Sequence, residues 1–366
     1  MVIVLEPDYA DPKGTVEAIR TAAKRFEGVK VKPFDFSGTT HAFTEVHLIG
    51  RTEAVPTQDF EGLPGVLRVV RVSSRYRIIG RHEATETVGF TFNGVTFDDK
   101  TLNILPGLCA VDKKENVASM MKALREEGIT TTRMGAYKPR TSPYDFQGLG
   151  EECLPYTFEL AGKYGIKVIA MEVTDTRQID EISEALERAG EPTGVMFQVG
   201  TRNAQNFELL KALGQQDKGP VLFKRGMGIT LEESLNACEY VASEGNPNIV
   251  FCLRGVKTHL GDPHRNLVDF AHVPVVRRQT RLPVCIDPSH SVGSMRKAPD
   301  GLPDMFHISA QGVIAGASMI LVDFHPKPEE ALCDGPQALT LNQLGPYVAA
   351  MRTVRETYEN LTESFV

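Results

Sequence analysis

Residues 167–213 of the 366-residue chain read KVIAMEVTDTRQIDEISEALERAGEPTGVMFQVGTRNAQNFELLKAL and contain one pattern twice. An apolar run (167–173, then 194–198) precedes a stretch whose apolar residues recur at helical spacing (176–189, then 203–213). Both runs are apolar on their two faces, which is typical of parallel strands covered by helices. The segment therefore predicts two successive strand–helix units.

The same alternation extends from about residue 100 to the C-terminus. It predicts further strands at 102–105, 130–136, 220–224, 249–253, 283–287 and 319–324, and further helices at 115–127, 151–163, 230–243 and 341–358. Eight such units in about 260 residues are typical of a (β/α)8 TIM barrel. A doubly wound open sheet is the structural alternative.

The first eighty or so residues follow a different pattern. It predicts strands at 1–5, 29–36, 44–50 and 66–79, a helix at 11–26 and a short helix around Phe60. The order β-α-β-β-α-β is that of a ferredoxin-like α+β domain. We expect an α/β protein with this small domain over residues 1–82 and a barrel domain over 83–366.

The composition of the chain argues against a nucleic-acid partner, a membrane partner and secretion. The net charge of -7 disfavours a nucleic-acid partner. No apolar run reaches the roughly 20 residues of a membrane span, and acidic residues follow the first five residues directly, unlike a secretory signal. The six scattered cysteines indicate reduced thiols. We expect a cytoplasmic protein without a membrane partner.

Cationic residues lie at or just after the predicted strand ends. In a TIM barrel the C-terminal strand ends form one rim, which carries the active site. Charged residues at such positions are also common as solvated loop residues, but Lys224 and Arg254 lie within or directly after apolar strands, where burial requires an anion. The rim predicts a site for one or two phosphorylated small molecules. Its cations are Arg133, Lys138, Arg140, Arg202, Lys224 and Arg254.

A second set of strand-end residues has the chemistry of metal ligands. Cys109, His290, Asp323 and Asp334 offer sulfur, nitrogen and oxygen donors, which suit a divalent Mn, Fe, Co or Zn ion. The alternative is a buried free thiol and an unrelated histidine. His325, close to Asp323, is a competing ligand.

Several longer motifs resemble those of 3-deoxy-7-phosphoheptulonate (DAHP) synthase, in the class I form with an N-terminal ferredoxin-like regulatory domain. The motifs are KPRTSPYDFQG (138–148), GTRN (200–203), FKRG (223–226), LRG (253–255), DPSH (287–290), HPKP (325–328) and CDGPQ (333–337). The resemblance implies condensation of phosphoenolpyruvate with erythrose 4-phosphate, the first step of the shikimate pathway. It also implies an aromatic amino acid effector and a homotetramer.

The resemblance assigns roles to the candidate residues. The positions that hold phosphoenolpyruvate in the family match Arg133, Lys138, Arg202, Lys224 and Arg254. A carboxylate beside them in the family matches Glu172. Lys138, Pro139, Arg140 and Thr141 form the motif that receives the aldose phosphate. Cys109, His290, Asp323 and Asp334 match the metal ligands. Lys138 is our candidate proton donor to the new alkoxide, with a pKa lowered by neighbouring cations; with Cys109 and His290 it makes up the expected catalytic set.

Four residues depart from the family pattern. They are Asp323 in place of glutamate, Leu108 in place of proline, Asp112 in place of glutamate and Thr201 in place of alanine. These changes leave open a different aldose phosphate. The alternatives are therefore a diverged homologue, including one of the 3-deoxy-octulosonate 8-phosphate type, or a catalytically silent regulatory paralogue.

Overall fold

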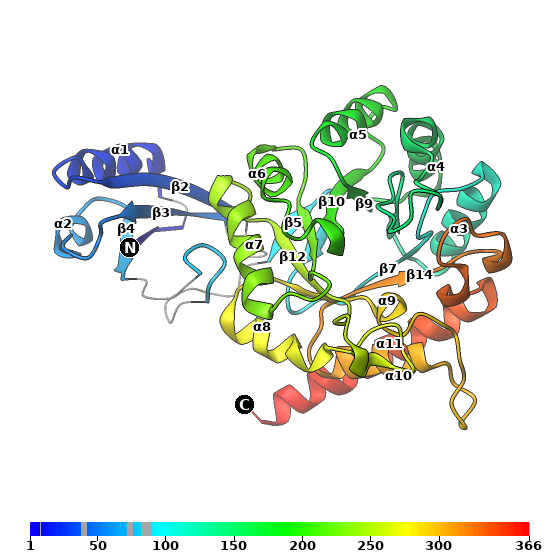
Figure 1. Cartoon of the computed structure of the whole chain (residues 1–366). Helices are drawn as coiled ribbons and strands as arrows, with labels where there is room; N and C mark the ends of the chain where they lie inside the picture. The colour runs from blue at the N-terminus through cyan, green and yellow to red at the C-terminus, as the bar shows by residue number, and fades with distance from the viewer. Residues whose placement is uncertain (8, 38–41, 72–75, 82–88, 366) are drawn as a thin grey trace.

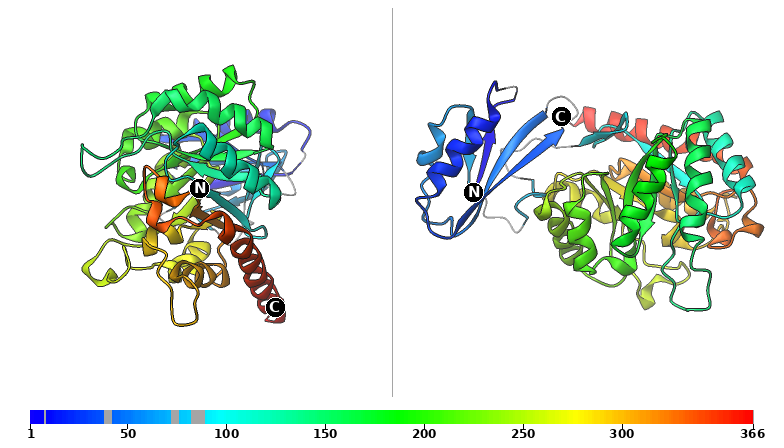
Figure 2. Two further views of the ribbon diagram at one scale, coloured as in Figure 1. Left: turned by 90° about the vertical axis from the view of Figure 1, so that its right-hand side faces the viewer. Right: turned by 90° about the horizontal axis from the view of Figure 1, so that it is seen from above.

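The protein has two parts, a closed barrel and a small antiparallel sheet at one end of it (Figures 1 and 2). The structure is a computed structural model that describes residues 1–7, 9–37, 42–71, 76–81 and 89–365. The α/β class expected from the sequence is confirmed.

Eight parallel strands form the barrel. They are β7 (Asn103–Gly107), β8 (Thr131–Met134), β9 (Val168–Val173), β10 (Gly194–Val199), β11 (Val221–Lys224), β12 (Ile249–Leu253), β13 (Val284–Ile286) and β14 (Met319–Asp323). The order β7-β14-β13-β12-β11-β10-β9-β8 leaves β7 and β8 at the two ends. These ends meet, because Thr131 and Thr132 Oγ1 donate to the carbonyls of Ile104 and Pro106 at 2.9 and 2.6 Å. The barrel is therefore confirmed over the open sheet.

Helices surround the strands (Figure 1). They are α3 (Lys114–Glu126), α4 (Leu154–Tyr164), α5 (Arg177–Arg188), α6 (Phe207–Gln215), α7 (Leu231–Glu244), α8 (Val273–Gln279), α9 (Pro288–Val292), α10 (Asp304–Ile314) and α11 (Leu341–Ser364). The helix predicted from residue 203 begins at Phe207, because the Asn206 side chain caps it by accepting from Leu209 N. Short 3-10 turns lie at Gly150–Cys153, Thr201–Asn203, His259–Gly261, Phe270–His272, Pro328–Glu330 and Gly335–Gln337.

A hairpin that we did not expect closes the N-terminal end of the barrel. It consists of β5 (Phe90–Phe92) and β6 (Val95–Phe97), joined by Asn93 and Gly94, both with positive φ. Its side chains pack with the barrel interior; this cluster is Phe90, Val95, Phe97, Leu105, Val168, Ala170, Met196, Leu222, Val250, Cys252, Cys285, Met319 and Leu321. Three-residue strands are too short for a periodic signal, although an Asn-Gly pair is a known hairpin signal.

The N-terminal sheet has the ferredoxin-like arrangement. Its elements are β1 (Val2–Leu5), α1 (Pro12–Ala23), β2 (Val29–Ser37), β3 (Ala42–Gly50), α2 (Gln58–Glu61) and β4 (Val66–Val70), with strand order β2-β3-β1-β4. The fourth strand ends at Val70 rather than continuing to 79. The proposed domain boundary at 82/83 lies outside the described residues.

A buried ion pair joins the two parts. Arg281, just before β13, donates to both carboxylate oxygens of Glu45 in β3 at 2.9 and 3.0 Å, and its Nε donates to the Ile78 carbonyl at 2.8 Å. The guanidinium lies 4.2 Å from the centre of the Phe36 ring. The small domain therefore contacts the N-terminal ends of the barrel strands.

In the ranges that the structure describes, we find no helix with both the length and the apolar character to cross a bilayer.

Candidate active site

A cavity of about 260 Å³ opens at the C-terminal strand ends. All the substrate-binding residues predicted from the sequence line it: Arg133, Lys138, Pro139, Arg140, Thr141, Glu172, Arg202, Lys224 and Arg254. Arg265 and Asp145, which the sequence analysis did not single out, line it too. A cavity lined mainly by cations can bind an anionic ligand.

The inner wall holds the buried cations. Arg133 Nη1 lies 2.8 Å from Asp323 Oδ1, Lys138 Nζ lies 3.2 Å from Glu172 Oε2, and Lys224 forms an ion pair with Asp287. Each of these three cations has a carboxylate partner, as burial of a charge requires.

Arg254 differs from these three cations. It is 2% exposed, and its Nε and Nη1 have no hydrogen-bond partner among the described residues. Burial lowers its pKa. Unpaired buried donors are costly, so an anion at this point of the cavity would satisfy them.

Gly200 allows the carboxylate of Glu172 to approach the chain. A Cβ at position 200 would coincide with the Glu172 carboxylate, so any other residue would displace it. The glycine of the GTRN motif thus keeps Glu172 beside Lys138.

The outer wall is formed by more exposed residues. Arg202 Nη2 donates to Thr141 Oγ1 at 3.0 Å, while Arg140 Nη2 lies 3.3 Å from Asp145 Oδ2. The loop after β8 that carries Arg140 is closed by hydrogen bonds from Lys138 N to Gln147 O and from Gly150 N to Ala136 O. The cavity therefore has a buried cationic base and a more exposed cationic mouth.

The expected pKa shift of Lys138 is wrong. Burial lowers the pKa of Lys138, but the negative charges of Cys109 and Glu172 outweigh burial and raise it well above its usual range. Lys138 Nζ lies 3.4 Å from Cys109 Sγ. The nearest charged neighbours are therefore anions, and Lys138 is a stable ammonium group.

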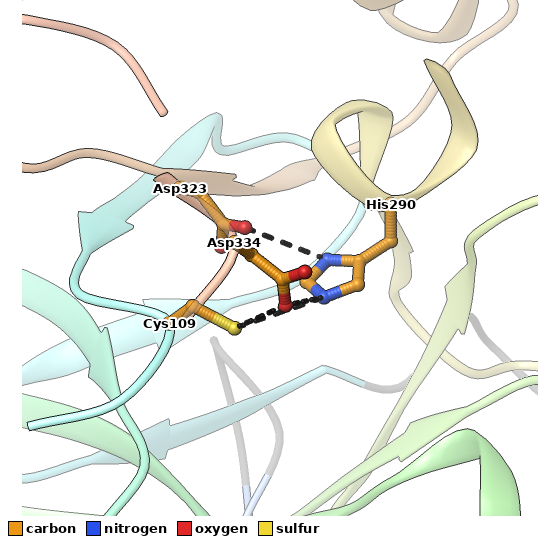
Figure 3. Close-up of side chains that lie close together, drawn as sticks. All are labelled: Cys109, His290, Asp323 and Asp334. Atoms are coloured by element: carbon orange, nitrogen blue, oxygen red, sulfur yellow. Dashed lines mark hydrogen bonds and ion pairs between the residues drawn. The ribbon is translucent and has the colours of Figure 1, made fainter. Parts of the chain in front are cut away.

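The four candidate metal ligands meet at one edge of the cavity (Figure 3). Cys109 follows β7, His290 lies on α9, Asp323 ends β14 and Asp334 lies in the next loop. Their ligand atoms all lie within 4.8 Å of one another. The sulfur, imidazole and carboxylate donors fit a divalent transition-metal ion.

The donors differ in their position around the imidazole ring. Cys109 Sγ lies 3.8 Å and Asp334 Oδ2 lies 3.6 Å from His290 Nε2, whereas Asp323 Oδ2 lies 3.8 Å from Nδ1. Figure 3 shows Cys109 and Asp334 on the Nε2 side of the ring and Asp323 on the other.

Asp287 fixes the position of the imidazole. Its carboxylate caps α9 by accepting from His290 N at 3.0 Å, and it also contacts His290 Nδ1 at 3.0 Å. Burial lowers the pKa of His290, but the charge of Asp287 outweighs burial and raises it to about 10. A carboxylate behind a ligating histidine is a common feature of metal sites.

Gln337 and Arg265 support the carboxylates, and neither was among the site residues predicted from the sequence. Gln337 Nε2 donates to Asp323 Oδ2 at 2.6 Å. Arg265 Nη1 donates to Asp334 Oδ1 at 3.1 Å and to Gln337 Oε1 at 3.0 Å. Gln337 belongs to the CDGPQ motif, but a motif does not show which way a side chain points.

His325, the competing ligand, lies outside the cluster. Its Nε2 contacts Asp112 Oδ2 at 2.7 Å, and its Nδ1 accepts from Lys327 N at 2.9 Å. Both ring nitrogens are engaged there, so His325 links the loops after β7 and β14.

Cys109 is poised to ligate as a thiolate. Its hydrogen bond with Cys333 and the charges of Lys138 and Arg133 outweigh burial and hold its pKa well below its usual range. Thiolate, not thiol, is the form that binds metals.

A family sequence model matches most of the chain. The sequence model described as the DAHP synthetase I family matches residues 84–360. The chain belongs to the DAHP synthetase I family. The resemblance inferred from the motifs is thus confirmed.

Two curated relatives differ in how much of the chain they match. Phospho-2-dehydro-3-deoxyheptonate aldolase of Thermotoga maritima is 36% identical over 356 residues, which are 97% of this chain and 98% of that protein. A 2-dehydro-3-deoxyphosphooctonate aldolase of Syntrophobacter fumaroxidans is 27% identical over 285 residues, 74% of this chain and 94% of that protein.

Solved structures agree with both parts of the fold. The crystal structure of the Thermotoga maritima DAHP synthase has a TM-score of 0.70 and 32% identity over 97% of each chain. A truncated form of the synthase from that organism has a TM-score of 0.67 and 33% identity, and covers 77% of this chain and 97% of its own.

Two of the departures from the family pattern, Leu108 and Thr201, add no free polar group to the cavity. Leu108 is fully buried in the core. Thr201 lines the cavity, but its hydroxyl donates to the Arg225 carbonyl at 2.7 Å. Asp323, in contrast, lies in the ligand cluster, where one methylene fewer than glutamate shortens its reach.

Proposed function

We propose that this member of the family is a 3-deoxy-7-phosphoheptulonate synthase, which condenses phosphoenolpyruvate with erythrose 4-phosphate to DAHP and phosphate. The observation that carries the proposal is the unpartnered, buried Arg254 at the base of a cationic cavity beside a thiol, imidazole and carboxylate cluster. The reaction joins two phosphorylated compounds, so its site requires two groups of cations.

The buried cations form the proposed phosphoenolpyruvate site. Arg133, Lys138, Lys224 and Arg254 are each at most 8% exposed, and Arg202 lies at the mouth. Charge-assisted hydrogen bonds from such groups are short and strong. They would hold the phosphate and carboxylate of this trianionic substrate and exclude water from its enol carbon.

The outer residues form the proposed aldose phosphate site. Lys138, Pro139, Arg140 and Thr141 run from the base of the cavity to its mouth. This path suits an extended substrate with its phosphate at the mouth and its aldehyde near the cluster.

Cys109, His290, Asp323 and Asp334 would hold the divalent metal, for which we propose Mn, Fe, Co or Zn. When bound, such an ion acts as a Lewis acid toward a carbonyl oxygen. Asp287, Gln337 and Arg265 fix the orientation of three of the ligands.

Lys138 is the proposed proton donor. The enol carbon forms a bond to the aldehyde carbon, the aldehyde oxygen takes a proton from Lys138, and the carbon that bears the phosphate becomes cationic. Water adds to this carbon and loses a proton to solvent, and the C–O bond to phosphate then breaks to leave the ketone. With its raised pKa, Lys138 remains protonated until an alkoxide, a much stronger base, forms beside it.

Phosphate release tests the function. Purified protein should release phosphate from phosphoenolpyruvate and erythrose 4-phosphate with Mn²⁺, lose this activity with a chelator, and regain it with added metal. Greater activity with arabinose 5-phosphate would instead support the sister reaction. No release with any four- or five-carbon aldose phosphate would leave only the silent paralogue.

For the N-terminal domain we propose allosteric regulation by an aromatic amino acid in a cytoplasmic homotetramer. The domain lies at the opposite end of the barrel from the cavity in the same chain, so within one subunit an effector bound to it would act at a distance from the site. The six free cysteines support a reducing compartment. Deletion of residues 1–81 should retain catalysis and abolish inhibition by tyrosine or phenylalanine, and inhibition that persists contradicts the assignment. Analytical ultracentrifugation tests the tetramer.

A further inference from the structure

Cys333 lies beside the ligand cluster and has no role in the function proposed above. Its Sγ is 3.7 Å from Cys109 Sγ and 3.2 Å from Asp334 Oδ2. The distances of Cys109 Sγ to His290 Nε2 and to Asp334 Oδ2 are 3.8 and 3.0 Å. Cys333 thus stands as close to two of the ligands as the ligands stand to each other.

The distance between the Cys109 and Cys333 sulfurs is close to that between two thiolates bound to one metal ion. Two thiolates at about 2.3 Å from one ion lie about 3.8 Å apart when the angle between the two bonds is near the tetrahedral value. The 3.7 Å between Cys109 and Cys333 matches this value without any movement of the chain.

The backbone directs two consecutive side chains to the same point. Asp334 has φ 55° and ψ 27°, a left-handed conformation that is uncommon outside glycine. With this turn, both Cys333 and Asp334 contact Cys109. Uncommon backbone conformations of this kind persist where the surrounding contacts of a site hold them in place.

The hydrogen bond with Cys109 and burial raise the pKa of Cys333, so without a bound ion its sulfur is a thiol. Cys333 is 8% exposed and belongs to a small cluster with Cys109 and Ala110. Arg140 Nη1 donates to its sulfur at 2.8 Å. A guanidinium beside a sulfur stabilises the negative charge that a ligand must carry.

Asp323 is the least available of the four ligands assigned from the sequence. Arg133 occupies its Oδ1 at 2.8 Å, and Gln337 occupies its Oδ2 at 2.6 Å. It also faces His290 Nδ1 rather than Nε2, the nitrogen nearest Cys109 and Asp334. A further strong donor on the Nε2 side would strengthen the coordination there.

We propose that Cys333 is a second sulfur ligand of the metal, in addition to Cys109, His290, Asp323 and Asp334. The inference rests on the proposed metal-dependent function. On binding, the Cys333 thiol gives its proton to solvent and its sulfur forms the bond to the ion. Two thiolates favour softer ions such as Zn²⁺, Co²⁺ and Cd²⁺ over Mn²⁺.

The sulfur count of the bound ion tests the proposal. Full-length protein is freed of metal with a chelator and loaded with one equivalent of Cd²⁺, and X-ray absorption then counts the sulfur neighbours. We expect two. A count of one in the wild-type protein overturns the proposal, whatever any variant does.

Cobalt titration adds a comparison between variants. Thiolate-to-Co²⁺ charge-transfer absorption should fall to roughly half in Cys333→Ser, because one of two Co–S bonds is lost. Cys153→Ser is the matched control, since Cys153 is buried but bonded to the Gly150 carbonyl, away from the cluster. Equal absorption in wild type and Cys333→Ser contradicts the proposal.

Metal preference provides a second readout. Cys333→Ser should lose affinity for Cd²⁺ about tenfold more than for Mn²⁺, as measured by competition with a chelating dye. Equal losses would argue against sulfur ligation. All three measurements use protein without substrate, so their failure leaves the proposed synthase activity standing, and absence of that activity leaves the sulfur count interpretable.

Discussion

Arg281 and Glu45, 236 positions apart in the chain, form two parallel hydrogen bonds of 2.9 and 3.0 Å, and both side chains are buried. His47 Nε2 contacts the same carboxylate at 2.9 Å. Burial raises the pKa of Glu45, but the hydrogen bond with His47 and the charge of Arg281 outweigh burial and lower it to about 2. This carboxylate therefore couples the docking of the two domains to ionisation.

Glu45→Gln should destabilise the protein in a pH-dependent way. Because the pKa of Glu45 is lowered by folding, its ionised form stabilises the protein fully above about pH 4.5, and this contribution is lost as the pH falls toward 2. We expect a loss of about 3 kcal/mol in the free energy of unfolding at pH 7. Urea unfolding at pH 7, 4 and 3 measures it. Glu27→Gln, at an exposed position, is the control, and a loss independent of pH contradicts the prediction.

Arg281→Met should show strong coupling to Glu45→Gln. Either single change leaves one buried charge without its counter-charge, whereas the double change removes both charges. The double variant should lose about 1–3 kcal/mol less free energy of unfolding than the two single losses added together. Urea unfolding of the four proteins at pH 7 gives the cycle, and additive losses would mean that the pair contributes no specific energy.

Arg254→Met should weaken function and strengthen the fold. Loss of its buried donors should reduce kcat/KM for phosphoenolpyruvate at least about 100-fold. Removal of a buried cation whose Nε and Nη1 donors are unsatisfied, and whose pKa burial lowers, should raise the Tm by a few degrees. Phosphoenolpyruvate should raise the Tm of the wild type but not of the variant.

Arg278→Met, at an exposed position on α8, is the matched control for Arg254. It should change neither quantity. A fall in Tm of Arg254→Met would mean that its charge is already compensated in the unliganded protein.

Gln337→Leu should weaken metal binding through Asp323. Without the 2.6 Å hydrogen bond the carboxylate is free to rotate, and loss of such a supporting contact typically costs about 10- to 100-fold in metal affinity. Calorimetric titration of chelator-treated protein with Co²⁺ measures this loss. Gln311→Ala, on the exposed face of α10, should bind as the wild type does, and unchanged affinity in Gln337→Leu would show that Asp323 is held by Arg133 alone.

The barrel and the membership of its rim could be predicted because they depend on periodicity. Strands such as Val168–Val173 are apolar on both faces, and parallel closure brings all their C-terminal ends together. Lys224 and Arg254 could be placed in the cavity for this reason alone. The motifs then supplied the family.

Partners within the site could not be predicted, because they depend on side-chain direction between distant residues. No sequence pattern pairs Arg133 with Asp323, 190 positions away, or brings Cys109 and Glu172 to Lys138. The predicted direction of the Lys138 pKa shift was wrong because the sequence does not show that Cys109 and Glu172 lie beside Lys138. The position of Cys333 depends on one left-handed residue, which the sequence Cys-Asp-Gly does not specify.

The hairpin at the N-terminal end of the barrel sets the order in which this chain can finish folding. Phe90 and Phe97 precede every barrel strand, yet they belong to one buried cluster with Met319 and Leu321 of the last strand and Leu105 of the first. A growing chain on the ribosome therefore carries exposed aromatic side chains until β14 emerges. The interior can be sealed only after nearly the whole protein has been synthesised, which makes the hairpin a segment in need of protection from aggregation during translation.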